Sequence, residues 1–361
     1  MKREYMLRAL ELAEKGRGRV SPNPMVGAVI VHDDCIIGEG YHRVFGEAHA
    51  EVNAVNSVRN KELLSKSTLY VTLEPCSHWG KTPPCAELII RMGIPKVIIA
   101  CVDPFPKVAG RGIAMMREAG IEIEIGLCEE EARQQNKVFF TAFEKCRPYI
   151  TLKWAQSADG FLDKKREPDA PHVPTIISTP YTHMLVHKLR SEVDGIMVGT
   201  NTVIQDNPSL TVRRWSGHNP TRITVDRTHR IPSEYHLLDG STPTLLFTST
   251  VQEGIKAEQI EIDFDKDPLL QILWKLHSRK IYHLLVEGGS QLHESFIQAG
   301  LWDELIVETS ATALHEGVKA PAVAGVQIHC ERHGSASVAT YRNDHLAPEI
   351  FEEDHRCELC C

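Results

Sequence analysis

Apolar positions in the first part of the chain follow two spacings, one typical of helices and one typical of strands. Residues 3–15 carry apolar side chains at helical spacing, while short apolar runs at 28–31 and 36–40 flank Asp33 and Asp34, which indicate a turn. The alternation then predicts helices near 49–58, 85–92, 111–119 and 129–143, and strands at 69–73, 96–102 and 121–125. Strands that alternate with helices favour a mostly parallel sheet covered on both faces.

A second alternating segment begins after Arg147 and Pro148, which interrupt the first one. Its apolar runs predict strands near 149–154, 194–199, 221–226, 243–248, 258–262, 282–286 and 304–310, and helices near 180–191, 268–278 and 290–299. The last forty or so residues are weakly patterned. Because 361 residues exceed one ordinary core, we predict two α/β domains, 1–146 and 147–361.

Composition and charge narrow the class of protein. Hydrophobic and charged shares of 42% and 24% are those of a globular protein, and a formal charge of −8 gives no basic footprint for nucleic acid. The charged amphipathic start lacks the apolar stretch of a signal peptide, and no run of about 18 apolar residues predicts a membrane span. Ten cysteines are too few for a disulfide scaffold. We expect a cytoplasmic protein without a nucleic-acid or membrane partner.

A histidine and two cysteines stand at the ends of predicted elements. His49 and Glu51 fall at the start of a helix, Cys76 follows a strand, and Cys85 opens the next helix. One imidazole and two thiolates are three ligands for a tetrahedral zinc, and the fourth position stays open for water, as in catalytic sites. His-x-Glu followed by Pro-Cys-x-x-Cys is the signature of zinc nucleobase deaminases. Here the second cysteine, Cys85, stands farther from the first, so the match is not to the short-loop members. Glu51 is then predicted to be the proton shuttle, and one zinc per chain is expected.

Other interpretations of the cysteines exist. A structural zinc site would need a fourth ligand, for which Cys101 and His78 are conceivable. Cys357, Cys360 and Cys361 at the chain end cannot close a tetrahedral site alone, so a reactive or disordered tail is the expectation there.

Two sets of motifs resemble one known family. Thr72–Cys85, which contains Glu-Pro-Cys-Ser-His and Gly-Lys-Thr-Pro-Pro-Cys, and Ser21–Gly27 are similar to the deaminase half of the RibD family of bifunctional riboflavin biosynthesis enzymes. The second half continues the resemblance with Leu152-Lys153, His187–Arg190, Asp194–Gly199, Asp206–Arg213 and Val286–Gly289. The resemblance extends to about residue 325.

The resemblance implies a fold and two reactions. It implies a cytidine-deaminase-like three-layer α/β/α domain followed by a dihydrofolate-reductase-like α/β domain. The first would hydrolyse the 2-amino group of 2,5-diamino-6-(5-phosphoribosylamino)pyrimidin-4(3H)-one. The second would reduce the ribosyl chain with NADPH to give 5-amino-6-(5-phosphoribitylamino)uracil. A phosphorylated pyrimidine is therefore the expected small-molecule partner. Proteins of this family often self-associate, so the resemblance also implies a homo-oligomer.

The resemblance also implies site residues. In the deaminase half the substrate contacts would be Asn23, His42, His78 and Lys81. In the reductase half, Lys153, Asp206 and Glu287 would be the catalytic polar residues around the ribose, and which of them supplies the proton stays open. Asp206, Leu210, Arg213 and Glu287 would contact the substrate, and Ala155, Thr202, Gly288, Gly289, Ser290, Gln291 and Leu292 would contact NADPH.

The reductase half departs from the family in one segment. A Ser-x-Trp-Ile-Thr sequence is expected before the helix at 180, but Pro174 and Ile176 replace its serine and tryptophan, and His183 replaces an arginine. Either His183 or Arg190 compensates, which we favour, or the reductase half is degenerate and the protein is a deaminase only. Another zinc nucleotide deaminase and a non-catalytic nucleotide-binding protein are the remaining alternatives.

Overall fold

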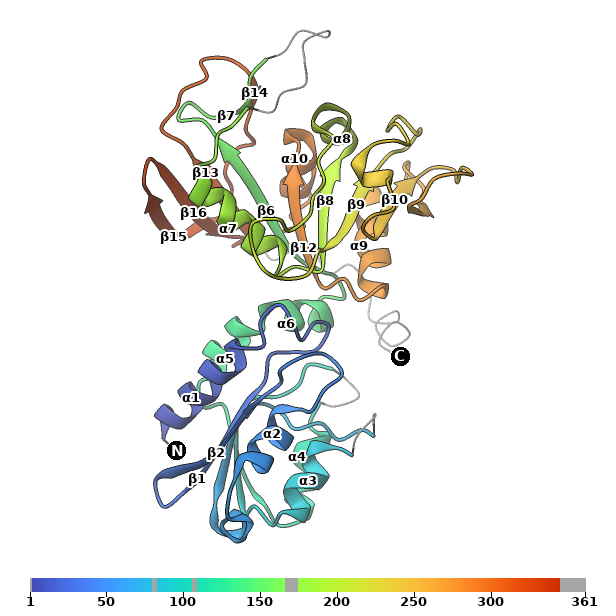
Figure 1. Ribbon diagram of the computed structural model, residues 1–361. Helices are drawn as coiled ribbons and strands as arrows, with labels where there is room; N and C mark the ends of the chain where they lie inside the picture. The colour runs from blue at the N-terminus through green and yellow to red at the C-terminus, as the bar shows by residue number, and fades with distance from the viewer. Residues whose placement is uncertain (1, 80–82, 106–108, 166–174, 345–361) are drawn as a thin grey trace. The chain divides into compact units, whose positions relative to one another are not determined.

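The computed structural model of the protein describes residues 2–79, 83–105, 109–165 and 175–344. Lys81, Pro174, Cys357, Cys360 and Cys361 lie outside these ranges. The chain divides between Cys146 and Arg147 into two units, each with its own sheet (Figure 1). No helix in the described ranges has both the length and the apolarity to cross a bilayer.

The first unit contains a five-stranded sheet in the order β2-β1-β3-β4-β5. The strand bounds are β1 (Gly27–His32), β2 (Cys35–Tyr41), β3 (Thr68–Leu73), β4 (Lys96–Cys101) and β5 (Glu122–Ile125). β1 runs antiparallel to β2 and β3, whereas β3, β4 and β5 are parallel. Asp33 and Asp34 both have positive φ, which matches the predicted hairpin turn.

Helices cover both faces of this sheet because its strands are apolar on both sides. Val29 and Val31 of β1 pack with α1 (Arg3–Glu14) and α5 (Glu129–Gln135), while Ala28 and Ile30 pack with α2 (Ala50–Ser57). The α2 face also carries α3 (Cys85–Arg91) and α4 (Arg111–Glu118), and a 3₁₀ turn spans Lys61–Lys66. The result is a three-layer α/β/α sandwich (Figure 1).

One predicted helix of this unit is in fact two. The expected helix at 129–143 is divided at Asn136 into α5 and α6 (Lys137–Glu144). Asn136 has φ −101° and ψ 25°, and its buried side chain is occupied by a tertiary contact with Met25. Sequence periodicity does not reveal this break because the apolar residues on both sides face the same core.

The second unit contains a nine-stranded sheet in the order β11-β10-β9-β8-β12-β6-β13-β16-β15. The first seven of these strands are parallel, and β16 and β15 are antiparallel additions at one edge. The bounds are β6 (Tyr149–Gln156), β8 (Gly195–Gly199), β9 (Thr221–Val225), β10 (Thr244–Thr248), β11 (Glu258–Glu261), β12 (His283–Gly288), β13 (Glu304–Thr309), β15 (Val326–His333) and β16 (Ala336–Arg342).

Helices lie on both faces of this sheet as well. α9 (Pro268–Ser278) and α10 (Ser290–Gln298) cover one face through a core that includes Leu152 and Val286. α7 (Pro180–Arg190) and the short α8 (Thr200–Asp206) lie against the other, where Leu189 and Val203 pack near Leu285. Figure 1 shows α7 in front of the sheet and α10 behind it.

The sequence patterns missed several elements here. α8, the two-stranded sheet of β7 (Phe161–Asp163) and β14 (Val318–Lys319), and the β15–β16 hairpin were not expected. The weakly patterned end of the chain thus continues the main sheet as far as Arg342. β15 escapes a periodicity search because it is an edge strand with seven of its eight residues exposed, so no alternation of burial shapes its sequence.

Candidate active sites

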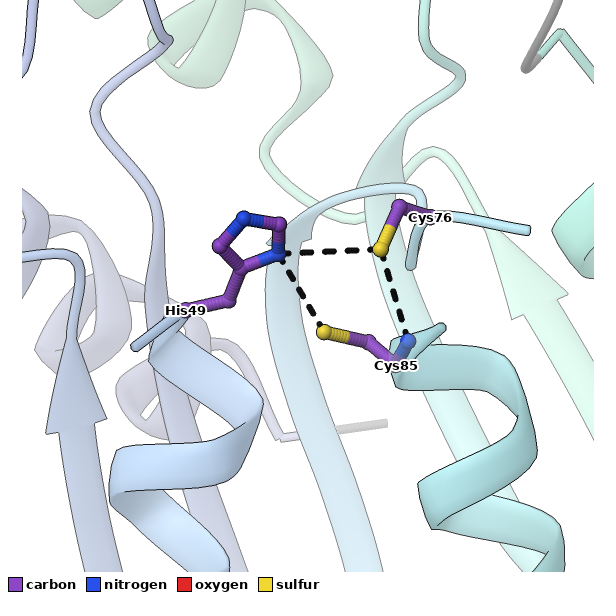
Figure 2. A group of neighbouring side chains, drawn as sticks. All are labelled: His49, Cys76 and Cys85. Carbon is purple, nitrogen blue, oxygen red and sulfur yellow. Dashed lines mark hydrogen bonds between the residues drawn. The ribbon is translucent and has the colours of Figure 1, made fainter. Parts of the chain in front are cut away.

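The three predicted zinc ligands of the first unit come from three elements that end at one point. His49 is the N-cap residue of α2, Cys76 lies three residues beyond the end of β3, and Cys85 is the first residue of α3. Their side chains converge (Figure 2), and one donor atom of each lies within 4.8 Å of the others. The structure therefore brings together residues 36 positions apart in the chain.

The distances in this cluster fit a tetrahedral metal. With Zn–N near 2.0 Å and Zn–S near 2.3 Å, tetrahedral geometry separates a nitrogen and a sulfur ligand by about 3.5 Å. His49 Nδ1 lies 3.6 Å from Cys76 Sγ and 3.4 Å from Cys85 Sγ. The amide of Cys85 donates to Cys76 Sγ at 3.4 Å, which holds the two cysteines in register. The geometry and the N/S donor set both fit zinc.

Protonation of the cluster points to a bound cation. Contacts with Cys85 and His49 lower the pKa of the Cys76 thiol to about 4, and contact with Cys76 raises the pKa of His49 to about 9. The thiolate is the form that binds a metal, and the extra proton on His49 balances its charge. A divalent cation held by His49, Cys76 and Cys85 would take the place of that proton.

Glu51 lies beside this cluster with an unused oxygen. Its side chain is buried in the first turn of α2, and burial raises the pKa of its carboxyl. Its Oε2 has no hydrogen-bond partner among the described residues. A buried, unpartnered carboxyl oxygen is costly unless a ligand uses it, so this atom marks the place of a reacting group.

Two of the four predicted substrate contacts of this unit are joined by a hydrogen bond. His42 Nδ1 lies 3.2 Å from the carbonyl of Ala48 and must donate to it. Burial lowers the pKa of His42, so its ring is neutral and Nε2 accepts from Asn23 Nδ2 at 3.2 Å. The amide of Asn23 is thereby oriented, with its oxygen left to read a ligand. The His42 ring also stands 5.5 Å from that of His49.

The other two predicted contacts belong to the loop between Cys76 and Cys85. His78 is exposed, and Trp79 beside it is 69% exposed. Lys81 lies outside the described residues. Cys101, conceivable as a fourth metal ligand, instead donates to the carbonyl of Thr72 at 3.3 Å and is not part of the cluster.

Glu74 is a residue of this site that the sequence analysis did not single out. Its buried carboxylate accepts hydrogen bonds from the amides of Gly110, Gly112 and Ile113 at 2.9, 3.0 and 3.2 Å. It thus caps α4 from the end of β3, two residues before Cys76. A Cβ at Gly112 would stand 2.1 Å from the carbonyl oxygen of Pro75, so the helix and the Cys76 turn touch. The Glu-Pro-Cys spacing was its only signal.

In the second unit, two adjacent parallel strands each lead directly into a helix. β8 is followed by α8, and β12 is followed through Gly289 by α10. Gly289 has φ +80°, which favours glycine, and a Cβ at Gly288 would lie 2.9 Å from Thr202 Cγ2. The predicted NADPH contacts Thr202, Gly288 and Gly289 are therefore neighbours in space.

The start of α10 can receive an anion. Its first internal hydrogen bond runs from His293 N to Gly289 O, so the amides of Ser290, Gln291 and Leu292 precede it. Free amides at a helix N-terminus after a glycine turn are suited to a phosphate group. His293, which the sequence analysis missed, is buried with Nδ1 3.0 Å from Gly289 O and Nε2 3.1 Å from Val286 O, and its neutral ring can donate to one of these two carbonyls.

Glu287 is engaged in a buried ion pair. Arg190 donates to it through Nε at 2.9 Å and through Nη2 at 2.5 Å. Burial alone would raise the pKa of Glu287, but Arg190 lowers it overall, so the side chain is a carboxylate. Arg190 is therefore committed to Glu287 and does not replace the missing arginine at position 183.

Positive charge gathers instead around Arg213 and Arg214. Burial, and then Arg214 and Arg190, lower the pKa of His183, which makes it a neutral side chain. His187 is fully buried and accepts from the amide of Arg213 at 3.1 Å through Nδ1, while its Nε2 has no partner among the described residues. With Arg190 paired to Glu287, Arg213 and Arg214 are the other arginines whose charge acts on His183.

The remaining predicted residues divide by exposure. Asp206 is exposed at the last position of α8, and Ala155 lies on β6, paired with Glu308 of β13. Leu210 is 3% exposed and has φ +52°, and its side chain belongs to the core. Only the backbone of Leu210 can face a ligand.

Comparison with known proteins assigns both units. Residues 1–101 match the cytidine and deoxycytidylate deaminase zinc-binding region, and residues 148–328 match the RibD C-terminal domain. The riboflavin biosynthesis protein RibD of Aquifex aeolicus is 41% identical over 324 residues, which is 88% of either chain. The chain belongs to the RibD family. The Escherichia coli K12 RibD is 38% identical over 323 residues, 84% of this chain and 86% of that protein.

Solved structures of RibD proteins have the same fold. A diaminohydroxyphosphoribosylaminopyrimidine deaminase/5-amino-6-(5-phosphoribosylamino)uracil reductase from Thermotoga maritima superposes with a TM-score of 0.84 at 35% identity, covering 94% of this chain and 98% of that one. Acinetobacter baumannii RibD gives 0.85 at 34% identity, covering 95% and 99%. The predicted fold class is confirmed, and so is the joining of a zinc-binding deaminase half to a reductase half, whose cofactors in RibD proteins are zinc and NADPH.

Proposed function

We propose that this RibD protein deaminates 2,5-diamino-6-(5-phosphoribosylamino)pyrimidin-4(3H)-one and then reduces the ribosyl chain of the product to a ribityl chain. The observation that carries the proposal is the cluster of His49, Cys76 and Cys85 beside the unpartnered Oε2 of Glu51. The Thermotoga maritima relative named for both reactions supports the second half.

In the deaminase unit, His49, Cys76 and Cys85 would hold one zinc ion per chain. Zinc at such a site makes a nucleophilic water available at neutral pH. Glu51 Oε2 would carry one proton of that water to the ring nitrogen beside the attacked carbon, and then carry the remaining hydroxyl proton to the amine, which leaves as the C–N bond breaks. One water enters and one ammonia leaves, while Glu51 ends in its starting state.

Recognition of the pyrimidine would fall to Asn23 and its neighbours. Because Asn23 Nδ2 is used by His42, its Oδ1 is the atom that can accept from a ring or amino N–H. His78 would read another edge of the pyrimidine, and Lys81 would meet the phosphate, for which the ammonium of a lysine is a suitable partner.

In the reductase unit, the turn at Gly288 and Gly289 and the start of α10 would bind NADPH, with Thr202 and Ala155 beside it. NADPH supplies a hydride to the first carbon of the opened sugar. A protein group must then protonate the neighbouring heteroatom. Glu287, held as a carboxylate by Arg190, is the poorest donor of the three candidates, which leaves Lys153 and Asp206.

Arg213 and Arg214 would bind the substrate phosphate. Arg190 is consumed by Glu287 and His183 is neutral, so these two arginines are the groups that can compensate for the missing arginine. This replaces the expectation that His183 or Arg190 compensates.

The test is incubation of the purified protein with the diaminopyrimidine substrate, with and without NADPH, followed by mass spectrometry. Deamination replaces NH₂ by OH and adds about one mass unit, and reduction adds two hydrogens. A product that gains one unit but never the further two would favour the alternative of a deaminase with a degenerate reductase half. The observation that favours this alternative is the 91% exposure of Ile176, which lies in the segment that departs from the family.

Assembly and location belong to the same proposal. We expect a homo-oligomer, which sedimentation velocity tests, and a cytoplasmic enzyme, which cell fractionation tests. The cysteines in the described ranges form no disulfide, which agrees with a reducing compartment. The expectation that neither nucleic acid nor a membrane is a partner stays a prediction.

A further inference from the structure

We propose that Glu308 is a positioning residue of the reductase site, which holds the ammonium of Lys153 in place and ties the segment 175–182 to it. This inference rests on the reductase function proposed above. Glu308 was expected only as one position of an apolar strand near 304–310.

The strand order places Lys153 between two carboxylates. β6, which carries Lys153, lies between β12 and β13 in the sheet. Val286 of β12 pairs with Leu152, which puts Glu287 next to Lys153 on one side, and Ile306 of β13 pairs with Lys153 on the other. Leu152 and Val307 face the α9–α10 core, so their neighbours Lys153 and Glu308 project from the opposite face.

Glu308 is the ion partner that Lys153 has in the described structure. Lys153 Nζ lies 3.7 Å from Glu308 Oε2, and the two side chains are 12% and 1% exposed. Glu287 is already neutralised by Arg190. A carboxylate as buried as Glu308 needs a compensating cation, and in the described ranges Lys153 is the one that makes an ion pair with it.

Two hydroxyls before and within α7 fix the rotamer of Glu308. Ser178 Oγ donates to Oε2 at 2.7 Å, and Thr182 Oγ1 donates to Oε1 at 2.5 Å. Thr182 lies in the first turn of α7, which Thr179 caps by accepting from the amide of Thr182 at 3.1 Å. Both oxygens of the carboxylate are thus held by the segment that departs from the family pattern.

One helix therefore holds both carboxylates that flank Lys153. The start of α7 binds Glu308, and its last residue, Arg190, binds Glu287. Lys153 lies between two carboxylates, and α7 and the residues just before it supply side-chain contacts to both. The departing segment 175–182 keeps a role in the site, since its hydroxyls act on Lys153 through Glu308.

Three substitutions separate the parts of this arrangement. Glu308→Gln keeps the volume and one acceptor oxygen but removes the charge. Glu308→Asp keeps the charge on a stem one carbon shorter. Glu304→Gln is the matched control, because Glu304 lies on the same strand and face but its carboxylate accepts from the hydroxyl of Tyr149 at 3.1 Å.

The experiment measures NADPH oxidation with the deaminated substrate, using the full-length enzyme. Glu308→Gln is expected to lower kcat by about 10–100-fold, the cost of a misplaced catalytic lysine, with the KM for NADPH within about twofold. The isotope effect with NADPH deuterated at C4 should rise as chemistry becomes limiting. Glu308→Asp should have a kcat between those of Glu308→Gln and wild type, and Glu304→Gln should have the wild-type kcat. The rate of deamination should be unchanged in every variant.

The outcomes are distinguishable. If wild type oxidises NADPH and Glu308→Gln does so equally fast, the positioning role is wrong while the proposed function stands. If Glu308→Gln raises the KM for NADPH and lowers the melting temperature without changing kcat or the isotope effect, Glu308 only supports the fold, and the inference is again wrong. If wild type itself oxidises no NADPH although it deaminates, the proposed reductase function fails and this inference fails with it.

Discussion

The side-chain amide of Asn136 binds both backbone groups of Met25. Its Oδ1 accepts from the amide of Met25 at 2.8 Å, and its Nδ2 donates to the carbonyl of Met25 at 2.8 Å. Met25 lies two residues beyond Asn23, the residue whose amide is set by His42. The α5–α6 junction thereby fixes the loop that would read the pyrimidine.

Replacement of Asn136 should weaken substrate binding more than zinc binding. Asn136→Asp keeps the acceptor for the Met25 amide but turns an oxygen toward the Met25 carbonyl, which costs about 1–3 kcal/mol in a buried place. We expect the KM for deamination to rise about tenfold and the zinc content to stay near one per chain. Steady-state kinetics and metal analysis measure both, with the exposed Gln134→Ala as control. If Asn136→Asp lost zinc together with activity, the role of Asn136 would not be confined to the loop that contains Asn23 and Met25.

Glu51→Gln should abolish deamination while zinc stays bound. The amide cannot accept and return a proton, and loss of a general acid–base group costs about 100- to 10,000-fold. Zinc content by atomic absorption should be unchanged, because the metal cluster consists of His49, Cys76 and Cys85. Reduction of the already deaminated pyrimidine serves as the internal control. Deamination at the wild-type rate would refute the proton-shuttle role.

Glu74→Gln should loosen the turn that carries Cys76. The NH₂ group of the glutamine would face at least one of the backbone N–H groups of Gly110, Gly112 and Ile113, and two donors cannot bond to each other. The loss of stability is about 1–3 kcal/mol. Faster hydrogen exchange at 110–113 and weaker zinc retention against a chromophoric chelator are the expected results. Glu118→Gln, exposed at the far end of α4, is the matched control. Equal exchange in both variants would mean that Glu74 does not cap the helix.

His187 makes the second unit sensitive to acid. Burial, then Arg190, lowers the pKa of His187 to about 4, and its Nδ1 is already occupied by the amide of Arg213. The unfolded chain, with an ordinary histidine pKa near 6.5, takes up the proton first. The contribution of neutral His187 to the free energy of unfolding should therefore be fully present above pH 6.5. It should decrease as the pH falls from 6.5 toward 4.

Urea unfolding followed by tryptophan fluorescence can measure this. Of the five tryptophans, four (Trp154, Trp215, Trp274 and Trp302) belong to the second unit. His187→Asn offers an amide oxygen near the position of Nδ1 but does not titrate, so the loss of stability between pH 7 and pH 5 should become smaller. The same pH dependence in the variant and in wild type would exclude His187 as its source.

Local sequence signals predicted the parts of this molecule that local chemistry determines. His49, Cys76 and Cys85 could be predicted as metal ligands from the residues next to them. Pro-Cys and Pro-Pro-Cys mark the ends of elements, where metal ligands can converge. The strand that leads to Gly289 was predicted from its apolar run, although it ends at Gly288 and not at residue 286. Most elements agree with the apolar spacing to within two residues.

What the sequence did not reveal depends on pairs far apart in the chain. Asn136 acts on Met25 from 111 positions away, and Glu308 receives Thr182 from 126 positions away. Neither residue type nor spacing marks such partners before the fold brings them together. Arg190 was considered as a substitute cation, and only its contact with Glu287 excludes it.

The break at Asn136 has a consequence for how this protein can be divided. The zinc-binding match ends at residue 101, yet α5 and α6 supply Ala132, Phe139 and Phe140 to the core and clamp the substrate loop. A fragment trimmed to the motif would keep every metal ligand, expose the part of one sheet face that α1 leaves uncovered, and release Met25. A transplantable deaminase module therefore has to extend through Glu144, forty-three residues past the point where the recognisable signature stops.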